Sequence, residues 1–352
     1  MADSAASKQA VLPAELERII FGFMASHALF TGDELGVLDR LAAGGTHPAE
    51  ELARARGVSA AALDRLLVAL VSLGVLERAQ GGYRMAEHLR PFLDRKSERY
   101  CGGMFPLLKN FSTQTFMHLT SAIGDGKPKW DRVLPRGTSP FEAFFSQEET
   151  RERFGAAMWA MGYLAAKELV PLLALEGRHQ LVDLGGGSGS FSVAALERWP
   201  ELTARIYDLP AMEPTVRGTI DRHGLSGRLE FMGGDFFNGQ LPEADVYSLG
   251  YILSDWTDEV CVQLLRRVHA VMPPGGRVLI LERLFDDDKA GPVPTALMDL
   301  CMMLESGGRH RTVGEYNELL RSSGFQPQAV YRSSGEKHMV IGSKPDGTGQ
   351  PG

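Results

Sequence analysis

The part of the sequence after Gly177 alternates between strand-like and helix-like segments, and this alternation limits the possible folds most strongly. Short apolar runs are separated by amphipathic stretches such as DEVCVQLLRRVHAVM and TVGEYNELLRSSGF. This pattern predicts an α/β fold with a parallel sheet and right-handed crossovers. Strands are expected at QLVDL, ARIYDL, RLEFMG, DVYSLGYIL, RVLILERL, PQAVYRS and HMVIGS. Their number and order favour a Rossmann-like, doubly wound sheet of seven strands.

A glycine-rich segment, LVDLGGGSGSF, contains the end of the first of these strands. Ligands of open α/β sheets bind at the carboxyl ends of the strands, so this loop is the expected place for a cofactor. A dinucleotide fingerprint would need glycine where this chain has Ser190. The spacing of Gly185, Gly187 and Gly189 instead lets the backbone approach a ligand that has no pyrophosphate. It favours S-adenosyl-L-methionine over NAD, with S-adenosyl-L-homocysteine as the product.

Acidic and aromatic residues at the ends of the next strands support this cofactor. Asp208 ends the second strand, at about the distance where a carboxylate takes ribose hydroxyls. In GGDFF, Asp235 can accept the adenine amino group and Phe236 can lie on the ring. Asp183 either orients the loop or faces the amino group of the cofactor. Taken singly, each residue is equally consistent with an ordinary turn or a solvated carboxylate. The remaining predicted cofactor contacts are Leu209 and Trp256.

The N-terminal part has a different, helical texture. From Pro13 to Leu93 apolar residues recur at three- and four-residue spacing, and a helix-turn-helix is followed by a small hairpin at ERAQGGYRM. This winged-helix pattern is common in DNA-binding proteins. However, its second helix, Ser59 to Leu73, carries only Asp64 and Arg65 as charges, and a recognition helix must present polar groups to a groove. The segment is therefore expected to pack and to form a dimer.

Composition agrees with a small-molecule partner and not with nucleic acid. The net charge is −7, whereas nucleic-acid binders usually carry a basic surplus. The three cysteines are far apart and predict reduced thiols and no metal site. No apolar run is long enough for a membrane span, and a cytoplasmic protein is expected. With 352 residues, the chain is expected to contain a dimerisation domain at 13–100, a helical segment with pocket walls at 101–176, and a cofactor domain at 177–345.

Several segments together resemble a known family. They are FMASHALFTGDELGVLDRLA, VDLGGGSGSF, GDFFNGQLPEADVYSLGYILSDWTDE, MPPGGRVLILERLF and GGRHRTVGEYNELLRSSGF. The chain resembles the acetylserotonin O-methyltransferase and plant phenolic O-methyltransferase family over about residues 15–345. The resemblance implies a class I S-adenosylmethionine-dependent enzyme. It also implies a homodimer joined through the N-terminal domain and a small aromatic or natural-product acceptor.

The catalytic positions depart from the family pattern. In that family a histidine in a His-Asp-Trp motif takes the acceptor proton, and two acidic residues steady it. The first acidic position is Glu282, but the histidine position is Ser254 and the second acidic position is His310. A basic residue that contacts the cofactor in many members is replaced by Gly250.

The altered base position leaves the mechanism open. A phenol with a pKa of about 10 is only about one part in a thousand ionised at neutral pH, so a positioned base is useful. Serine cannot serve alone. His310 either takes the proton with Glu282 polarising it, or is a solvent-facing residue before Thr312, a suitable N-cap for the next helix.

The predicted reaction is in-line methyl transfer to a hydroxyl of a small aromatic secondary metabolite. Two alternatives stay open from the sequence: C-methylation of an activated phenolic ring or acidified carbon, and a cofactor-binding relative that performs other chemistry. An apolar slot with one carboxylate, suited to a flat ring, is expected, although plain helix packing is the more common explanation of any single Met or Phe in this region. The predicted acceptor contacts are Phe116, Phe154, Met158, Met161, Tyr251, Asp255, Met298, Asp299 and Met302.

Overall fold

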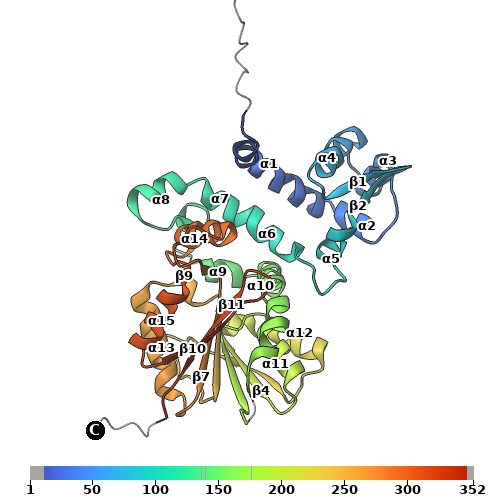
Figure 1. Ribbon diagram of the computed structural model, residues 1–352. Coiled ribbons are helices and arrows are strands. Elements are labelled where there is room, and N and C mark those ends of the chain that lie inside the picture. The colour runs from blue at the N-terminus through green and yellow to red at the C-terminus, as the bar shows by residue number, and fades with distance from the viewer. Residues whose placement is uncertain (1–11, 136, 139, 176, 347–352) are drawn as a thin grey trace, which may run out of the picture. The chain divides into compact units, whose positions relative to one another are not determined.

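The computed structural model describes residues 12–135, 137–138, 140–175 and 177–346 (Figure 1). The chain divides into two compact units, one ending at Gly102 and the other beginning at Gly103. The finer division at residues 100 and 176 stays a prediction.

The first unit is helical apart from one hairpin. Ser59 accepts a hydrogen bond from the Ala62 N–H and caps α4, whose Leu63, Leu67 and Leu70 are buried at the three- and four-residue spacing of one helix face. The expected hairpin is present as an antiparallel pair. The elements are α1 (Ala14–Glu34), α2 (Val37–Ala42), α3 (Ala49–Arg56), α4 (Ala60–Ser72), β1 (Leu76–Ala79), β2 (Gly82–Met85), η1 (Glu87–Leu89) and α5 (Arg90–Leu93).

The second unit is built on a seven-stranded sheet, which confirms the predicted fold class. The strand order is β10-β11-β7-β6-β3-β4-β5. Strand β11 pairs in antiparallel fashion with both of its neighbours, β10 and β7, and the other neighbouring strands are parallel. The strands are β3 (Gln180–Leu184), β4 (Thr203–Asp208), β5 (Leu229–Gly233), β6 (Val246–Gly250), β7 (Arg277–Glu282), β10 (Gln326–Tyr331) and β11 (His338–Ser343). A separate parallel pair is formed by β8 (Leu284–Phe285) and β9 (Arg311–Thr312).

Helices cover both faces of this sheet (Figure 1). One hydrophobic core lies under α10, α11 and α12, and a second lies under α13 and α15. The central strands are buried on both faces, as is usual for parallel strands covered by helices. These helices are α10 (Glu148–Leu169), α11 (Ser190–Arg198), α12 (Glu213–His223), α13 (Asp258–Val271) and α15 (Val313–Ser322).

Shorter helices complete the second unit. Among them α14 packs against α7 and α8, and α9 packs against α10. They are η2 (Gly102–Met104), α6 (Phe105–Leu107), η3 (Leu108–Ser112), α7 (Thr113–Phe116), α8 (Leu119–Asp125), η4 (Trp130–Arg132), α9 (Pro140–Phe145), η5 (Val170–Leu172), η6 (Pro210–Met212), η7 (Leu253–Asp255) and α14 (Val293–Glu305).

Candidate functional site

The glycine-rich loop joins the end of β3 to the start of α11. Gly185 has a φ of +67°, and an added Cβ there would collide with the side chain of Ile252. Glycine is therefore required for the turn and for the close approach of the neighbouring loop. At Gly187 an added Cβ would meet nothing within 4 Å, so the backbone there faces open space. This edge of the sheet is where ligands of doubly wound folds bind.

Two buried aspartates hold this loop in place. The Asp183 carboxylate accepts hydrogen bonds from Ser192 Oγ at 2.8 Å and Ser248 Oγ at 2.7 Å. The Asp208 carboxylate accepts from the backbone N–H groups of Gly187 at 2.8 Å and Leu209 at 2.7 Å. Burial raises the pKa of Asp208 to about 6, so it is ionised at neutral pH. Both aspartates thus hold the loop through both of their carboxylate oxygens, and each ionised carboxylate keeps further lone pairs that can accept from a ligand.

The loop after β5 places an acidic turn beside a group of aromatic rings. Asp235 accepts hydrogen bonds from the Phe237 N–H at 2.8 Å and from Asn238 Nδ2 at 2.7 Å, and these bonds lower its pKa. The rings of Phe236 and Phe237 lie 4.7 Å apart, and Phe237 meets Trp256 edge to face at 4.8 Å. The predicted residues Asp235, Phe236 and Trp256 are therefore brought together, with Phe237 between them.

The pairing of β8 with β9 brings two distant residues together beyond the end of β7. Leu284 pairs with Arg311, so the residue before β9 lies beside the end of β7. His310 Nδ1 lies 4.0 Å from Glu282 Oε2, although 28 positions separate the two residues in the sequence. Ser254 lies at the same place, because its backbone N–H donates to Glu282 Oε1 at 3.1 Å. The three predicted catalytic residues thus form one cluster.

The Glu282 and His310 side chains are both buried. His310 is 2% exposed, which rules out the solvent-facing alternative, while Thr312 does cap α15 through a capping box with Glu315. Burial, with the cations of Arg283 and Arg311, lowers the pKa of His310 to about 3. Burial raises the pKa of Glu282 to about 7.

Several polar atoms of this cluster lack hydrogen bonds. Within the described residues neither ring nitrogen of His310 has a hydrogen-bond partner, and Glu282 Oε2 has none either. Buried polar atoms are rarely left unsatisfied in a folded protein. These atoms of His310 and Glu282 are therefore available to a ligand or to a transferred proton.

Comparison with known proteins decides the family. Residues 116–326 match the O-methyltransferase domain family, and residues 17–94 match the O-methyltransferase dimerisation domain. The chain belongs to the O-methyltransferase family. Acetylserotonin O-methyltransferase of Gallus gallus is 33% identical, and the match covers 92% of this chain and 95% of that protein. The 3-hydroxy-5-methyl-1-naphthoate 3-O-methyltransferase of Streptomyces sahachiroi is 30% identical, with coverages of 94% and 95%.

A solved structure agrees with these matches. The crystal structure of human N-acetylserotonin methyltransferase in complex with S-adenosylmethionine superposes with a TM-score of 0.88. It is 29% identical to this chain, and the match covers 97% of this chain and all of that one. The protein is an S-adenosylmethionine-dependent O-methyltransferase, which confirms the predicted cofactor and the predicted transfer of a methyl group to oxygen.

The residues of the O-methyltransferase fit this cofactor. Asp208 and Asp235 carry carboxylate oxygens of the kind that accept from hydroxyl and amino groups, as adenosine has, and Phe236 has an aromatic ring of the kind that stacks on a base. The open space above Gly187 leaves room at the strand edge. Leu209, the residue after Asp208, is 38% exposed and is therefore accessible at this edge.

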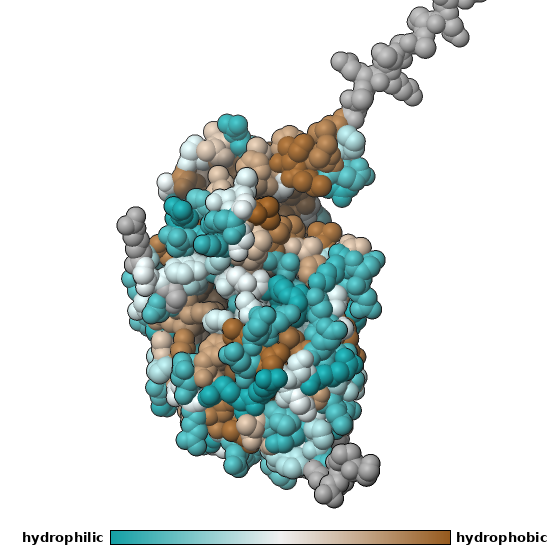
Figure 2. Space-filling model, turned by 90° about the vertical axis from the view of Figure 1, so that its left-hand side faces the viewer, coloured by the Kyte–Doolittle hydropathy of each residue, from teal (hydrophilic) through white to brown (hydrophobic). Residues whose placement is uncertain are grey.

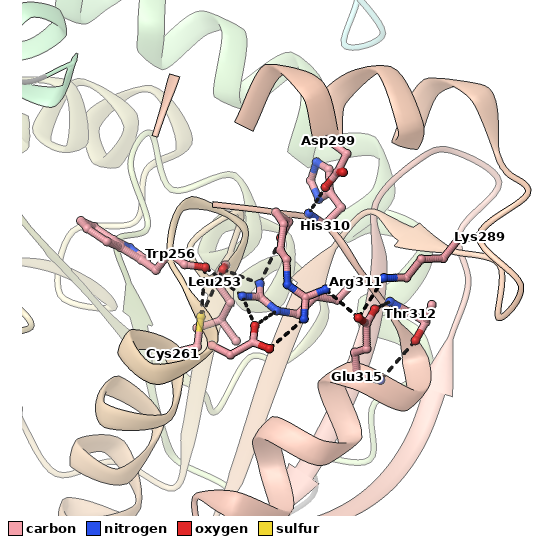
Figure 3. Close-up of polar contacts among 11 residues, drawn as sticks. Leu253, Trp256, Cys261, Lys289, Asp299, His310, Arg311, Thr312 and Glu315 are labelled. Carbon is pink, nitrogen blue, oxygen red and sulfur yellow. Dashed lines mark hydrogen bonds and ion pairs between the residues drawn. The ribbon is translucent and has the colours of Figure 1, made fainter. Parts of the chain in front are cut away.

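The predicted acceptor contacts of the O-methyltransferase fall into two groups. The first group lies on two helices that pack against each other: Phe116 is on α7, and Met298, Asp299 and Met302 are on α14. Asp299 Oδ1 accepts a hydrogen bond from the backbone N–H of His310 at 2.6 Å. Figure 3 shows Asp299 beside His310.

The second group follows α10. Phe154 stacks on Phe144 at 5.2 Å, and Met158 and Met161, on the same helix, are half-buried. Aromatic contacts continue through α9, where Phe141 stacks on Trp256 at 6.4 Å. The described contacts therefore link α10 to the loop after β6 but do not join all of the predicted residues into one pocket.

The two predicted contacts after β6 are also close to the catalytic cluster. Tyr251 has a positive φ of 58°, and its hydroxyl is buried without a hydrogen-bond partner among the described residues. Burial of the Asp255 carboxyl, together with the negative charges of Glu282 and Glu305, raises its pKa well above the usual range. Both residues flank Ser254.

Sequence reasoning missed Arg311, whose side chain is 0% exposed (Figure 3). Its guanidinium donates to the Leu253 carbonyl at 2.7 Å, to the Trp256 carbonyl at 2.8 Å and to Asp258 Oδ1 at 2.7 Å. It thereby fixes the loop that carries Ser254. The GGRHRT segment contained this arginine, but only the pairing of β8 with β9 shows that it is buried.

Sequence reasoning also missed Lys337, which lies just before β11. Its Nζ would be 2.9 Å from a Cβ added at Gly250, so a cation is present near the position where the family resemblance implies a basic residue. No local motif marks this lysine, because its position depends on the pairing of β11 with β7.

None of the helices, within the residues that the structure describes, is long and apolar enough to cross a membrane.

Proposed function

We propose that the enzyme transfers a methyl group from S-adenosylmethionine to the phenolic hydroxyl of a small aromatic acceptor. The observation that carries this proposal is the buried Glu282–His310 pair, which has unpaired polar atoms beyond the end of β7. A hydroxyl loses a proton when it is methylated, so a reaction at oxygen needs a proton acceptor at such a place.

We infer that the adenosine part of the cofactor is held by three of the predicted residues. Asp208 accepts the ribose hydroxyls, Asp235 accepts the adenine amino group and Phe236 covers the ring. Leu209 and Trp256 flank these groups, and Asp183 keeps the loop of Gly185 and Gly187 in position. When bound, S-adenosylmethionine supplies a methyl carbon made electrophilic by its sulfonium.

The proton of the acceptor hydroxyl is taken by His310 with the support of Glu282. The imidazole is neutral at pH 7, because burial lowers its pKa to about 3, so a ring nitrogen has a free lone pair. On its own such an imidazole is a weak base. The Glu282 carboxylate, with a pKa of about 7, lies 4.0 Å away and stabilises the imidazolium as it forms.

The acceptor class is inferred from the named relatives and from the half-buried apolar residues. Acetylserotonin and hydroxymethylnaphthoate, the acceptors in the relatives' names, are both flat aromatic hydroxyl compounds. Met158, Met161, Met298 and Met302 offer flexible apolar surface that adapts to such rings. Asp299 and Asp255 add carboxyl groups that can bind a polar substituent of the acceptor.

The test is a product analysis with both acceptor classes. The purified enzyme is incubated with methyl-labelled S-adenosylmethionine and either N-acetylserotonin or a 3-hydroxynaphthoate, and the product is examined by carbon and proton NMR. We expect label on oxygen, with an O-methyl shift. Label on a ring carbon, or no loss of label from the cofactor with a panel of phenols, would contradict the proposal.

We also propose that two chains form a homodimer through the dimerisation domain. Helix α1 exposes large apolar side chains, including Ile19 at 77%, Phe23 at 61% and Met24 at 53%. In Figure 2 hydrophobic side chains form a brown patch at the upper right, over this N-terminal helix. A contiguous exposed patch of this kind marks an interaction surface in a folded protein.

We expect light scattering at micromolar concentration to give twice the 38.4 kDa mass of one chain. The double variant Ile19→Glu/Phe23→Glu should give the monomer mass, because charges cannot be buried unpaired in an interface. The matched control is Ile123→Glu on α8, which removes another exposed apolar side chain, 65% exposed, from the second unit. A monomeric wild type, or a double variant that stays dimeric, would count against an interface at α1.

A further inference from the structure

A buried lysine, Lys337, lies at the strand edge with no directly bonded counter-ion among the described residues. Lys337 is 6% exposed, and within the described residues its ammonium has no hydrogen bond or ion pair. The Nζ atom instead sits 4.1 Å from the centre of the Tyr251 ring, a cation–π contact. A buried ammonium is normally paired, since removing an unpaired charge from water is costly.

Nearby protein groups do not neutralise this ammonium fully. Asp183 and Glu282 are close enough to favour its charge, but burial and the Arg283 cation oppose it, and the pKa of Lys337 falls to about 8. Both oxygens of Asp183 already accept hydrogen bonds from serines. The ammonium is therefore charged at neutral pH, and it can still accept an anion as a direct partner.

The surroundings of Nζ place the ammonium beside the cofactor loop. A Cβ added at Gly250, the last residue of β6, would lie 2.9 Å from Nζ. A Cβ added at Gly162 would lie 3.5 Å from Nζ and 2.6 Å from Ser190 Oγ. Ser190 is the first residue of the nine-residue helix α11. The ammonium therefore lies between the end of β6 and the N-terminus of α11.

Two sources of positive potential meet at this place. The first backbone N–H groups of a helix have no partner within the helix, and the aligned peptide dipoles make this end positive. Lys337 adds a full charge. A helix N-terminus together with an unpaired ammonium is suited to bind an anion.

We propose that Lys337 pairs with the carboxylate of the methionine part of S-adenosylmethionine. Among the charged groups of this cofactor, the sulfonium and the amino group are positive at neutral pH, and only the carboxylate is negative. The proposal rests on the cofactor of the enzyme and not on the identity of the acceptor. Because Gly250 and Gly162 have no side chains, they leave the space that the Lys337 ammonium occupies.

The binding of three related ligands tests this pairing without any turnover. S-adenosylhomocysteine has the carboxylate, decarboxylated S-adenosylhomocysteine lacks only that group, and 5′-methylthioadenosine lacks the whole amino-acid part. In Lys337→Met, calorimetry should show S-adenosylhomocysteine binding weakened by about 10- to 100-fold, the loss of a charge-assisted hydrogen bond. The affinities for the other two ligands should change by less than about threefold.

Two controls separate a direct contact from a structural role. Lys337→Arg keeps the charge and should recover part of the affinity for S-adenosylhomocysteine. Lys167→Met removes a lysine from a surface ion pair with Glu197 and should leave all three affinities unchanged. Equal losses for S-adenosylhomocysteine and methylthioadenosine in Lys337→Met, or no loss for either, would overturn the proposal.

The wild-type enzyme provides an independent test if Lys337→Met does not fold. Removing the carboxylate from S-adenosylhomocysteine should itself cost about 10- to 100-fold in affinity. If the wild type binds decarboxylated S-adenosylhomocysteine as tightly as the intact ligand, the carboxylate has no cationic partner and the proposal is wrong. Neither result affects the assignment of methyl transfer, because the acceptor assay is separate.

Discussion

Replacing His310 with alanine should lower the turnover number by about 10²- to 10⁴-fold while leaving the affinity for S-adenosylhomocysteine nearly unchanged. In the proposed mechanism the imidazole takes the proton: among the described residues its ring nitrogens have no hydrogen-bond partner, and Glu282 Oε2 lies 4.0 Å from its Nδ1. His310 lies in the loop before β9 and not in the glycine-rich loop, so its loss should not alter cofactor affinity. Steady-state kinetics with a phenolic acceptor and calorimetry with S-adenosylhomocysteine measure the two quantities.

Ser254→Ala is the matched comparison for this prediction. Its backbone N–H, which donates to Glu282 Oε1 at 3.1 Å, is kept in the variant, so the loss in turnover should be mild. A severe defect in Ser254→Ala paired with wild-type turnover in His310→Ala would reject His310 as the base and identify the serine hydroxyl as an anchor for the acceptor. Mild effects of both substitutions, with rates that follow the pKa of the acceptor, would mean that the acceptor ionises unaided.

The pH dependence of the turnover number should follow Glu282. Its pKa is raised to about 7, so the carboxyl is mostly protonated below that pH and cannot stabilise an imidazolium. Turnover should therefore rise with pH through about 7 and level off above it. In Glu282→Gln this step should disappear from the profile and the plateau should be lower. A step that persists in Glu282→Gln would assign the titration to another group.

The alternation of strands and helices predicted the sheet, but two strand ends could not be placed from the sequence. DVYSLGYIL reads as one strand, yet β6 ends at Gly250, because Tyr251 adopts a positive φ of 58° and turns the chain. RVLILERL also reads as one strand, yet β7 ends at Glu282 and the next residues pair with β9 instead. Both breaks come from contacts with distant segments, which local periodicity does not contain.

The same reason limits what could be predicted of the site. The glycine loop and Asp208 are consecutive with their strands, so their spacing was enough to indicate the cofactor. The burial of His310 depends on the pairing of β8 with β9, and the sequence left its role open. Lys337 reaches the edge only because β11 lies antiparallel to β7, where His338 pairs with Glu282.

Arg311→Met should lower the free energy of unfolding of the second unit by about 3–5 kcal/mol, since it removes a buried guanidinium and leaves the backbone carbonyls that accept from it without their donor. The guanidinium donates to the carbonyls of Leu253 and Trp256 as well as to Asp258, and methionine replaces only its apolar stem. The expected fall in melting temperature is about 6–20 °C. Calorimetry of the variant and of the wild type at one pH measures it.

Arg205→Met is the matched control, since it removes an arginine that pairs with Glu230 at 3.0 Å on the surface. These two side chains are 39% and 63% exposed, so the change in free energy should be about 0.2–1 kcal/mol. If Arg311→Met is as mild as this control, the loop from Leu253 to Trp256 does not depend on the guanidinium. A large loss with Arg311→Met and a partial recovery with Arg311→Lys would show that a cation at this position holds the loop that carries Ser254 beside Glu282 and His310. Recovery should be partial, because lysine keeps the charge but reaches fewer carbonyl groups.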